Sequence, residues 1–302
     1  MQPSEFATTP WQAGSFRRRA PELLFGAMYE DPAIELEAFA PFSRVFCIAG
    51  AGCTARALSA AGHDVTAVDI NPSQILYAQA RAAGAPMREG AAERLLAHGR
   101  RLLPLLGWTE RRRREFLSLR DTSAQLGYWR RVLNSQRWRV AVDMLLSAAL
   151  LRLAYASPFL ASLPPHFGSR VRARLERGWA NHANCSNPYA WRLLLGEAPH
   201  EAEPPVPPVR FVCADAAAYL ENCPAASFDA FSLSNIADGA PSAYVRRLCR
   251  AMEHAAAPDA VVVTRSFAEP ATAAEHNRAA RDRSLLWGAV NVSRAGDLCF
   301  TF

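Results

Sequence analysis

The sequence predicts an α/β fold in which helices cover a mostly parallel sheet. An apolar run at residues 45–49 leads into Gly50-Ala51-Gly52, a short helical pattern follows, and a second apolar run at residues 65–68 ends at Asp69. A strand, a glycine turn, a helix and a second strand with an acid at its end are typical of the first unit of a nucleoside-binding sheet. Later apolar runs alternate with helical patterns, which extends this architecture.

The elements before and around this unit follow from local signals. Asp31-Pro32 predicts the start of a helix, with Ile34, Leu36 and Phe39 at its apolar positions. We therefore expect residues 1–43 to form an N-terminal helical preface. Strands are expected at residues 44–49 and 64–69, and Asn71-Pro72 should cap a helix that runs to residue 83.

Three later strands are predicted, at residues 209–213, 230–233 and 260–264. Residues 289–294 and 298–302 alternate in polarity on either side of Ala295-Gly296-Asp297, which predicts a C-terminal hairpin.

The distance between the second and third strands indicates an insertion. About 140 residues separate Asp69 from residue 209, whereas a crossover needs little more than one helix. Residues 90–200 have helical patterns rich in Arg, Leu and Trp, and the proline-rich stretch at 203–208 marks the return to the sheet. We predict an α/β domain at 44–89 and 201–302 that carries a helical insertion at 90–200.

The most apolar stretch of the insertion spans residues 140–160. Asp143 and Arg152 interrupt it, and its longest uninterrupted apolar run is far below the roughly 20 residues of a membrane span. We expect a buried helix here, with a helix that dips one face into a membrane as the alternative.

Composition limits the class of protein. The 302 residues are 50% hydrophobic and carry a net charge of +6, with 34 cationic residues that are all arginine. This charge permits an anionic partner such as a lipid surface without requiring one. No apolar core of a signal peptide occurs near the N-terminus, and the seven cysteines form no C-x-x-C pair, so we expect a cytoplasmic protein with reduced thiols. The histidines form no metal-binding spacing, and we predict no metal.

The glycine turn is the main candidate for cofactor binding. Gly50-Ala51-Gly52-Cys53-Thr54-Ala55 fits the pattern G-x-G-x-x-[GA], although tight turns without ligands also collect glycine. Asp69 lies 19 residues beyond Gly50 at the end of the next strand, where a carboxylate can accept hydrogen bonds from ribose hydroxyls. The alternative role of Asp69 is a helix N-cap. Because Asn71 can cap the following helix, Asp69 is available for a ligand.

Two further strand ends carry polar residues. Asp215-Ala216 follows the third strand, and Asp215 could accept the amino hydrogen of adenine or cap the next helix. Ser234, Asn235 and Asp238 follow the fourth strand, where ligands of open α/β sheets bind. These residues complete the predicted nucleoside site, with a turn cluster as the alternative for the second group.

Five segments together resemble one enzyme family. They are L-F-G-A-M-Y-E-D-P at 24–32, I-A-G-A-G-C at 48–53, V-D-I-N-P at 68–72, N-P-Y at 187–189 and L-S-N-I at 233–236. The chain resembles the S-adenosylmethionine:diacylglycerol 3-amino-3-carboxypropyltransferases, which make betaine-lipid headgroups, from residue 24 to about residue 288. This resemblance implies a class I methyltransferase-like, Rossmann-like sheet with a helical insertion, and S-adenosyl-L-methionine as the cofactor.

The resemblance also implies a reaction, in which a lipid hydroxyl attacks the methylene carbon beside the sulfonium and methylthioadenosine leaves. The enzyme would orient the reactants and supply a base, for which Glu30, Asp31 and Asp238 are candidates. Arg265 is the candidate for holding the methionine carboxylate, or it forms a surface ion pair. From their apolar character, we expect the helices at 90–200 to cover the carboxyl edge of the sheet and form the acceptor pocket; the alternative is that they only bury a second small core. The candidates for the pocket wall are Tyr128, Trp129, Asn187 and Tyr189.

Other functions remain open at this stage. The same pocket could present the methyl group, as in an ordinary methyltransferase, or the protein could bind the cofactor without catalysis. The glycine turn also fits a nicotinamide dehydrogenase, but the long insertion and the predicted hairpin argue against it. We expect a lipid-like acceptor and no nucleic acid. The arginine runs at 17–19 and 111–114 could make peripheral contact with anionic lipid, or form solvated helix faces.

Overall fold

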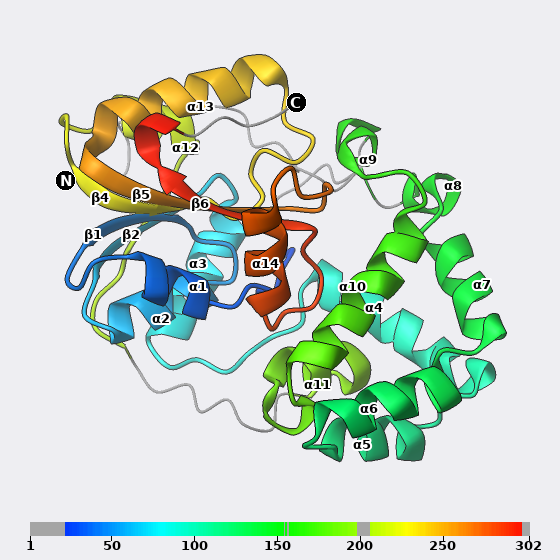
Figure 1. Cartoon of the computed structure of the whole chain (residues 1–302). Helices are drawn as coiled ribbons and strands as arrows, with labels where there is room; N and C mark the ends of the chain where they lie inside the picture. Colours follow the sequence, from blue (N-terminus) through cyan, green and yellow to red (C-terminus); the bar gives the residue numbers. More distant parts are fainter. Residues whose placement is uncertain (1–21, 154, 156, 198–205, 298–302) are drawn as a thin grey trace.

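The computed structural model describes residues 22–153, 155, 157–197 and 206–297. These residues form one six-stranded sheet with helices on both faces and a group of helices beside it (Figure 1). The strands are β1 (Arg44–Ile48), β2 (Asp64–Asp69), β3 (Arg210–Cys213), β4 (Phe228–Ser232), β5 (Ala256–Ser266) and β6 (Ala289–Arg294). The helices of the sheet domain are α1 (Ala33–Ala38), α2 (Cys53–Ala60), α3 (Pro72–Ala82), α12 (Ala216–Glu221), α13 (Ser242–Ala255) and α14 (Ala273–Arg281).

The sheet is Rossmann-like. Its strands lie in the order β3-β2-β1-β4-β5-β6, and every neighbouring pair is parallel except β5 and β6. The chain leaves β1 toward β2 on one side and β4 toward β5 on the other, so the strand order reverses between β1 and β4. At such a reversal the connections that leave the two neighbouring strands run in opposite directions, and the carboxyl ends of these strands border a crevice. The prediction of an α/β fold with a mostly parallel sheet is therefore confirmed.

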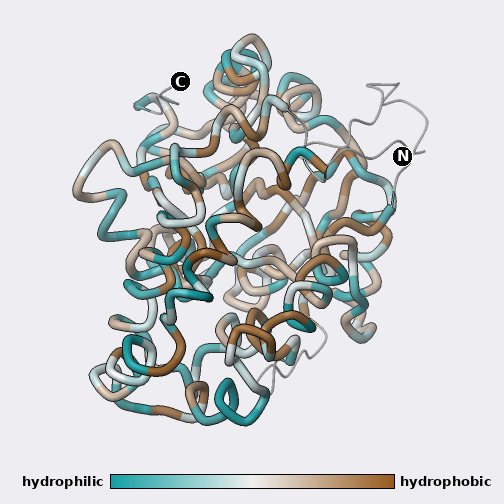
Figure 2. Tube along the Cα trace, turned by 90° about the vertical axis from the view of Figure 1, so that its right-hand side faces the viewer, coloured by the Kyte–Doolittle hydropathy of each residue, from teal (hydrophilic) through white to brown (hydrophobic). Residues whose placement is uncertain are grey.

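The strands alternate between two cores because successive side chains point to opposite faces. Val45 and Cys47 of β1 pack in the core under α1, α2 and α14, whereas Phe46 packs in the core under α12 and α13. Figure 2 shows apolar residues running through the interior, while the surrounding helices alternate between hydrophobic and hydrophilic turns. Burial of both faces explains why the strands read as nearly continuous apolar runs.

Between β2 and β3 the described residues form helices. After α3 these are α4 (Ala91–Leu102), η1 (Leu103–Leu106), α5 (Glu110–Ser118), α6 (Thr122–Tyr128), η2 (Trp129–Leu133), α7 (Gln136–Leu145), α8 (Ala148–Leu151), α9 (Ser157–Ser162), α10 (Phe167–Asn181), η3 (Asn184–Ser186) and α11 (Pro188–Leu195). We call residues 91–195 the helical lobe. It has its own aromatic core, in which Trp108 lies edge-on to Trp129 at 5.6 Å and Phe116 lies edge-on to Trp179 at 5.2 Å between ring centroids.

A loop from the sheet domain enters this core. Leu285, between α14 and β6, is buried among the aromatic residues of the lobe and has a left-handed backbone with φ +74°. A β-carbon at Gly178 of α10 would lie 2.2 Å from Leu285 Cδ2, so a glycine at this position allows close approach. The lobe is therefore fastened to the sheet domain by interlocking side chains.

Some sequence predictions were wrong. Residues 140–160 are not one buried helix: the described ones lie in α7, in α8, in α9 and in the short segments between these helices, and Val140, Met144 and Leu153 are exposed. In α1, Leu36 is exposed and Glu35 is buried, because the helical period places Glu35 and Phe39 on the same inward face.

The C-terminal hairpin is altered in part. Its first strand is β6, which pairs antiparallel with β5, and Ala295–Asp297 forms a short 3₁₀-helix (η4) in place of a hairpin turn. The second predicted strand, residues 298–302, and residues 1–21 of the preface with their arginine run lie outside the described residues. Within the described part of the chain, no helix has the length and apolar character needed to cross a membrane.

Two helical glycines provide a test of how tightly the lobe and the sheet domain interlock. Gly178→Ala places a methyl group against Leu285, and we expect the free energy of unfolding to fall by about 1–3 kcal/mol. At Gly99 of α4 an added β-carbon would meet nothing within 4 Å, so Gly99→Ala should stabilise by up to about 1 kcal/mol. Urea denaturation of both variants measures the difference. Equal stabilisation by both substitutions would contradict the interlocking.

Candidate functional site

Residues 22–31 cross the carboxyl edge of the sheet as an extended strap, and we use that name below. Its backbone is held from the sheet domain, where Gln74 accepts from Leu24 N at 3.2 Å and the Trp287 indole donates to Tyr29 O at 2.8 Å. It is also held from the lobe, where Glu93 accepts from Gly26 N at 2.8 Å. The strap therefore lies between the two parts of the molecule.

The glycine turn lies directly beneath the strap. Gly50 and Gly52 have φ angles of +48° and +78°, a region that glycine enters without strain. A β-carbon at Gly50 would lie 2.5 Å from Met28 Sδ, and one at Gly52 would lie 3.1 Å from Ala78 Cβ. Both glycines thus have structural reasons to be glycine. The pattern alone does not establish a ligand site.

Asp69 gives the turn a carboxylate. Its Oδ2 accepts a hydrogen bond from Gly50 N at 3.1 Å and its Oδ1 accepts one from Asn71 N at 2.9 Å. Burial raises the pKa of Asp69 to about 6, and the two backbone donors offset only part of that rise. Asn71 caps α3 by accepting from Ser73 N, as predicted, so Asp69 has no capping role. A half-buried carboxylate with a raised pKa at a sheet edge is a candidate ligand-binding group.

Glu30 of the strap reaches the ends of β1 and β4. Its carboxylate accepts from the hydroxyl of Ser234, just after β4, and lies 3.5 Å from Thr54 Oγ1 at the start of α2. Burial raises the pKa of Glu30, against the opposing effects of Arg265 and of the Ser234 hydrogen bond. Ser234 has φ +52°, an uncommon conformation for a residue other than glycine. In this backbone conformation the Ser234 hydroxyl donates to the Glu30 carboxylate.

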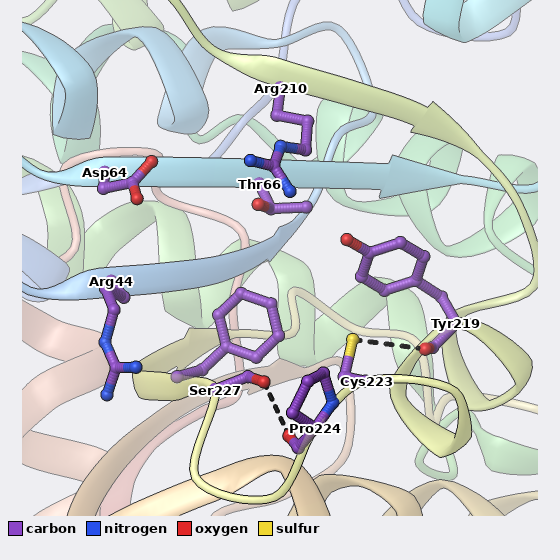
Figure 3. A pocket seen from close by; sticks show the side chains of 9 residues that line it. Arg44, Asp64, Thr66, Arg210, Tyr219, Cys223, Pro224 and Ser227 are labelled. Atoms are coloured by element: carbon purple, nitrogen blue, oxygen red, sulfur yellow. Dashed lines mark hydrogen bonds between the residues drawn. The ribbon is translucent and has the colours of Figure 1, made fainter. Parts of the chain in front are cut away.

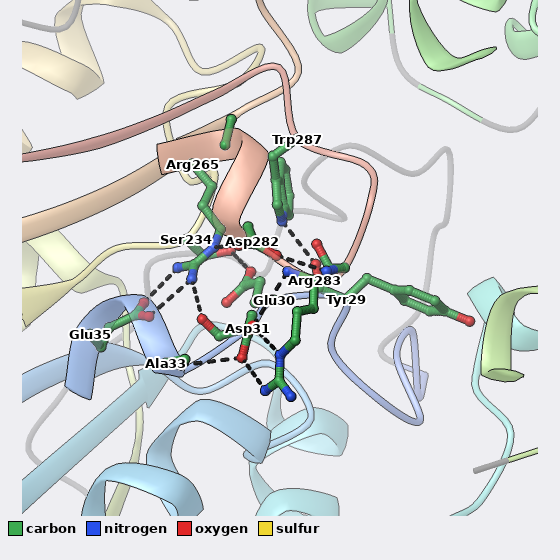
Figure 4. Close-up of polar contacts among 12 residues, drawn as sticks. Tyr29, Glu30, Asp31, Ala33, Glu35, Ser234, Arg265, Asp282, Arg283 and Trp287 are labelled. Carbon is green, nitrogen blue, oxygen red and sulfur yellow. Dashed lines mark hydrogen bonds and ion pairs between the residues drawn. The ribbon is translucent and has the colours of Figure 1, made fainter. Parts of the chain in front are cut away.

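Behind Glu30 lies a buried ion cluster (Figure 4). The Arg265 guanidinium pairs with Glu35 at 2.5 and 2.9 Å, with Asp282 at 2.9 Å, and donates to Asp31 O at 2.9 Å. Its side chain is fully buried, and despite that burial its acidic neighbours hold the pKa of Arg265 above its ordinary value. Four hydrogen bonds thus direct its guanidinium to acceptors inside the protein. These surroundings favour a structural role for Arg265 over the predicted role in holding a substrate carboxylate.

Asp31 belongs to the same cluster. Arg283 binds its carboxylate through two nitrogens, at 2.5 and 2.7 Å. Burial favours the neutral acid, but the hydrogen bonds and charge of Arg283 prevail and lower the pKa of Asp31. A carboxylate with a lowered pKa is a weak base. The prediction of Asp31 as a catalytic base is therefore not supported by its surroundings.

Asp238 lies beyond β4 on the other side of Ser234. It accepts from Ser266 Oγ at 2.6 Å, from Phe267 N at 3.0 Å and from Asn235 Nδ2 at 3.4 Å. Burial raises the pKa of Asp238, although these three donors oppose the rise. Asp238 and Asn235 thus lie at the predicted edge, but their polar atoms bind each other and β5.

Asp215 is a helix cap and an ion-pair partner. It accepts from Ala218 N at 2.9 Å at the start of α12, where Ala216 is the first helical residue, and from Tyr244 Oη at 2.9 Å. Arg247 lies 3.4 Å from the same carboxylate. The capping alternative is confirmed, and an additional adenine contact would have to compete with these partners.

The predicted acceptor-pocket residues divide into two groups. Tyr189 of α11 donates to Glu30 O at 2.6 Å, and Asn187 caps α11 and donates to Arg283 O at 2.9 Å, so both adjoin the strap and the ion cluster. Tyr128 binds Glu115 at 3.0 Å and Trp129 binds Glu176 at 3.1 Å, and these partners are inside the lobe. The structure does not bring Tyr128 and Trp129 to the sheet edge.

The most important residues that sequence reasoning missed are Met28, Glu35, Asp282 and Arg283. Glu35 could have been found, because counting back four residues from Phe39 places it on the inward face of α1. Asp282 and Arg283 carry no local signal: they follow α14 in sequence and reach Arg265 and Asp31, respectively, only through the tertiary fold.

A pocket of about 220 Å³ lies at the opposite edge of the sheet (Figure 3). Its lining includes Arg44, Asp64, Arg210 and Phe228, which are the first residues of β1, β2, β3 and β4. Ligands of open α/β sheets bind at the carboxyl ends of the strands. The Arg44 guanidinium in this pocket already pairs with Asp229 at 2.7 Å. We therefore assign the candidate site to the edge with the strap.

Comparison of the chain with protein-family models, curated proteins and solved structures finds no match.

The ion cluster can be tested by removing its cation. Arg265→Met leaves Glu35 and Asp282 buried without their partner, and we expect the free energy of unfolding to fall by about 3–5 kcal/mol. Arg281 pairs with Glu37 at the surface, so Arg281→Met should cost less than about 1 kcal/mol. Urea denaturation at pH 7 compares the two. A stable Arg265→Met variant that loses ligand binding would restore the substrate role.

Proposed function

We propose that the protein is an S-adenosylmethionine-dependent transferase that moves a 3-amino-3-carboxypropyl group to a hydroxyl of a lipid-like acceptor. The single observation that supports this best is that two carboxyl groups with raised pKa, the half-buried Asp69 and the buried Glu30, lie at strand ends on either side of the switch point of a Rossmann-like sheet. The first suits a ribose and the second suits proton transfer. The choice of carbon and of acceptor rests on the resemblance described above.

The residues present fit a nucleoside. Gly50 exposes backbone in a left-handed conformation, and the Asp69 carboxylate beside it is an acceptor for two hydroxyl hydrogens. The thioether of Met28 packs against Gly50 and provides an apolar, adaptable surface. In this proposal Asp69 holds the ribose, and the strap forms one wall of the site.

When bound, S-adenosylmethionine supplies an electrophilic carbon next to a sulfonium. The remaining requirements are orientation of the acceptor and removal of its hydroxyl proton. Glu30 is our choice for the base, because burial raises its pKa toward neutrality and Ser234 fixes its orientation. Asp31 is held as a weak base by Arg283, and Asp238 already accepts hydrogen bonds from three donors.

The raised pKa of Asp69 predicts how cofactor binding depends on pH. Ribose hydroxyls favour the charged carboxylate, which predominates above its pKa of about 6. Affinity for S-adenosylmethionine should therefore be full above pH 6 and fall by up to about tenfold for each unit below it. Titration calorimetry between about pH 5 and pH 8 measures this. Asp69→Asn should bind about 1.5–3 kcal/mol more weakly, with a flatter pH profile.

Two results would contradict the cofactor assignment. Unchanged affinity in a folded Asp69→Asn variant would remove Asp69 from the site. Tight binding of NAD in place of S-adenosylmethionine would favour a dehydrogenase.

The base assignment predicts different effects for three variants of similar shape. Glu30→Gln should lower turnover by about 10²–10⁴-fold with cofactor binding retained, because the proton acceptor is lost. Asp238→Asn should change turnover much less, and Asp31→Asn should act mainly on stability. Turnover is followed with labelled S-adenosylmethionine and a lipid extract, and the nucleoside product is identified. Full activity of Glu30→Gln would refute our base, and S-adenosylhomocysteine as sole product would indicate a methyltransferase.

A further inference from the structure

We propose that α7, α8 and the turn after α8 form a docking surface for an anionic lipid bilayer. The surface consists of the exposed residues Val140, Met144, Leu145, Leu150 and Leu153, and we call it the docking face. Exposure reaches 62% at Met144 and 79% at Leu153. In Figure 1 these two helices lie at the outer edge of the helical lobe. Several large aliphatic side chains exposed on neighbouring helices are uncommon on a protein surface without a partner.

The helical spacing explains why this face is apolar. In α7, Val142 turns inward and is buried, whereas Val140 and Met144 lie four residues apart on the outward side. The short helix α8 then presents Leu150 outward. The apolar character that predicted a buried helix from the sequence is therefore exposed in the fold. Exposure of these apolar side chains to water is unfavourable.

The charges around the docking face favour an anionic partner. Between residues 131 and 175 the chain has seven arginines and one acidic residue, Asp143, and two of these arginines, Arg170 and Arg174, already lie within 3.6 and 3.2 Å of Glu269. Arg172 neutralises Asp143 at 2.8 Å. Arg131 and Arg137 have no carboxylate partner among the residues that the structure describes, and Arg139 binds the side-chain amide of Asn134 at 3.1 Å. Exposed aliphatic residues among arginines fit a surface that is apolar below and negative above, as an anionic bilayer is.

The docking face leads to the candidate site. The next helix, α9, carries Phe159, whose Cα would lie 2.4 Å from a β-carbon at Gly239, one residue beyond Asp238. The Phe159 ring also lies edge-on to Phe267 at 6.0 Å, and Phe267 N binds Asp238. A bilayer on the docking face would thus bring lipid to the rim of the site. Delivery of lipid to the site rests on the proposed function, whereas binding of the docking face to a bilayer does not.

Flotation of the whole chain with vesicles tests the proposal. We expect binding to vesicles of phosphatidylcholine with phosphatidylglycerol, and little binding to phosphatidylcholine alone. Met144→Glu with Leu153→Glu should weaken partition by about 10- to 100-fold, since two aliphatic contacts are lost. The matched control is Leu36→Glu with Leu76→Glu, two residues of the sheet domain that are 41% and 67% exposed. This control should bind like the wild type.

The electrostatic part has its own variant. Arg137→Gln with Arg139→Gln should weaken partition to the anionic vesicles by about fivefold per arginine and leave phosphatidylcholine unaffected. Thermal melts show whether each variant is folded. Absence of wild-type flotation, or equal losses in docking and control pairs, would overturn the proposal. Light scattering that shows a wild-type dimer and a monomeric Met144→Glu/Leu153→Glu variant would also overturn it, in favour of a contact between copies.

The two proposals fail separately. Vesicle binding without S-adenosylmethionine binding would refute the proposed function and leave the docking surface. Turnover of S-adenosylmethionine with a detergent-dispersed acceptor, without vesicle binding, would refute the docking surface and leave the proposed function.

Discussion

The buried pairing of Arg265 with Glu35 and Asp282 is the interaction on which the rest of the site depends. These charges come from β5, α1 and the loop after α14, and none of them is exposed to solvent. An isolated buried charge is very costly, so each group requires the others in place. The cluster therefore fixes where α1 meets the sheet. Since the strap leads directly into α1, it also fixes the position of Glu30.

The strap carries residues that form the candidate site, and its position depends on this ion cluster. Its backbone is held by side chains of the sheet domain and of the helical lobe, so neither part alone would define its path. The same path places Met28 on Gly50 and Glu30 beside Ser234. Two acidic neighbours, Glu30 and Asp31, then acquire opposite pKa shifts: burial prevails at Glu30 and raises its pKa, whereas the hydrogen bonds and charge of Arg283 prevail over burial at Asp31 and lower its pKa. Such divergence allows neighbouring carboxyl groups to take different roles.

The helical lobe contacts the candidate site through two of its helices, α11 and α9. At one end α11 reaches the strap through Tyr189, and at the other α9 reaches the turn at Gly239 through Phe159. Between them lies an aromatic core closed by Leu285. The exposed aliphatic residues between 140 and 153 belong to the same lobe. The lobe can therefore link an outer surface to the sheet edge without large movements of the sheet.

The sequence by itself determined the sheet, the glycine turn, the position of Asp69 and the cap at Asn71, because each depends on residues close together in the chain. Strand periodicity and turn chemistry are local properties and can be read without a structure. It also identified Glu30, Tyr189 and Ser234 as candidates, although not their mutual contacts. Only the tertiary structure decided that Arg265 is a buried ionic centre, that Asp31 is held by Arg283, and that aliphatic residues such as Met144 and Leu153 are exposed. Those outcomes depend on charges and surfaces brought together from distant segments, and burial and pairing, not residue type, determine what an ionisable or apolar side chain does.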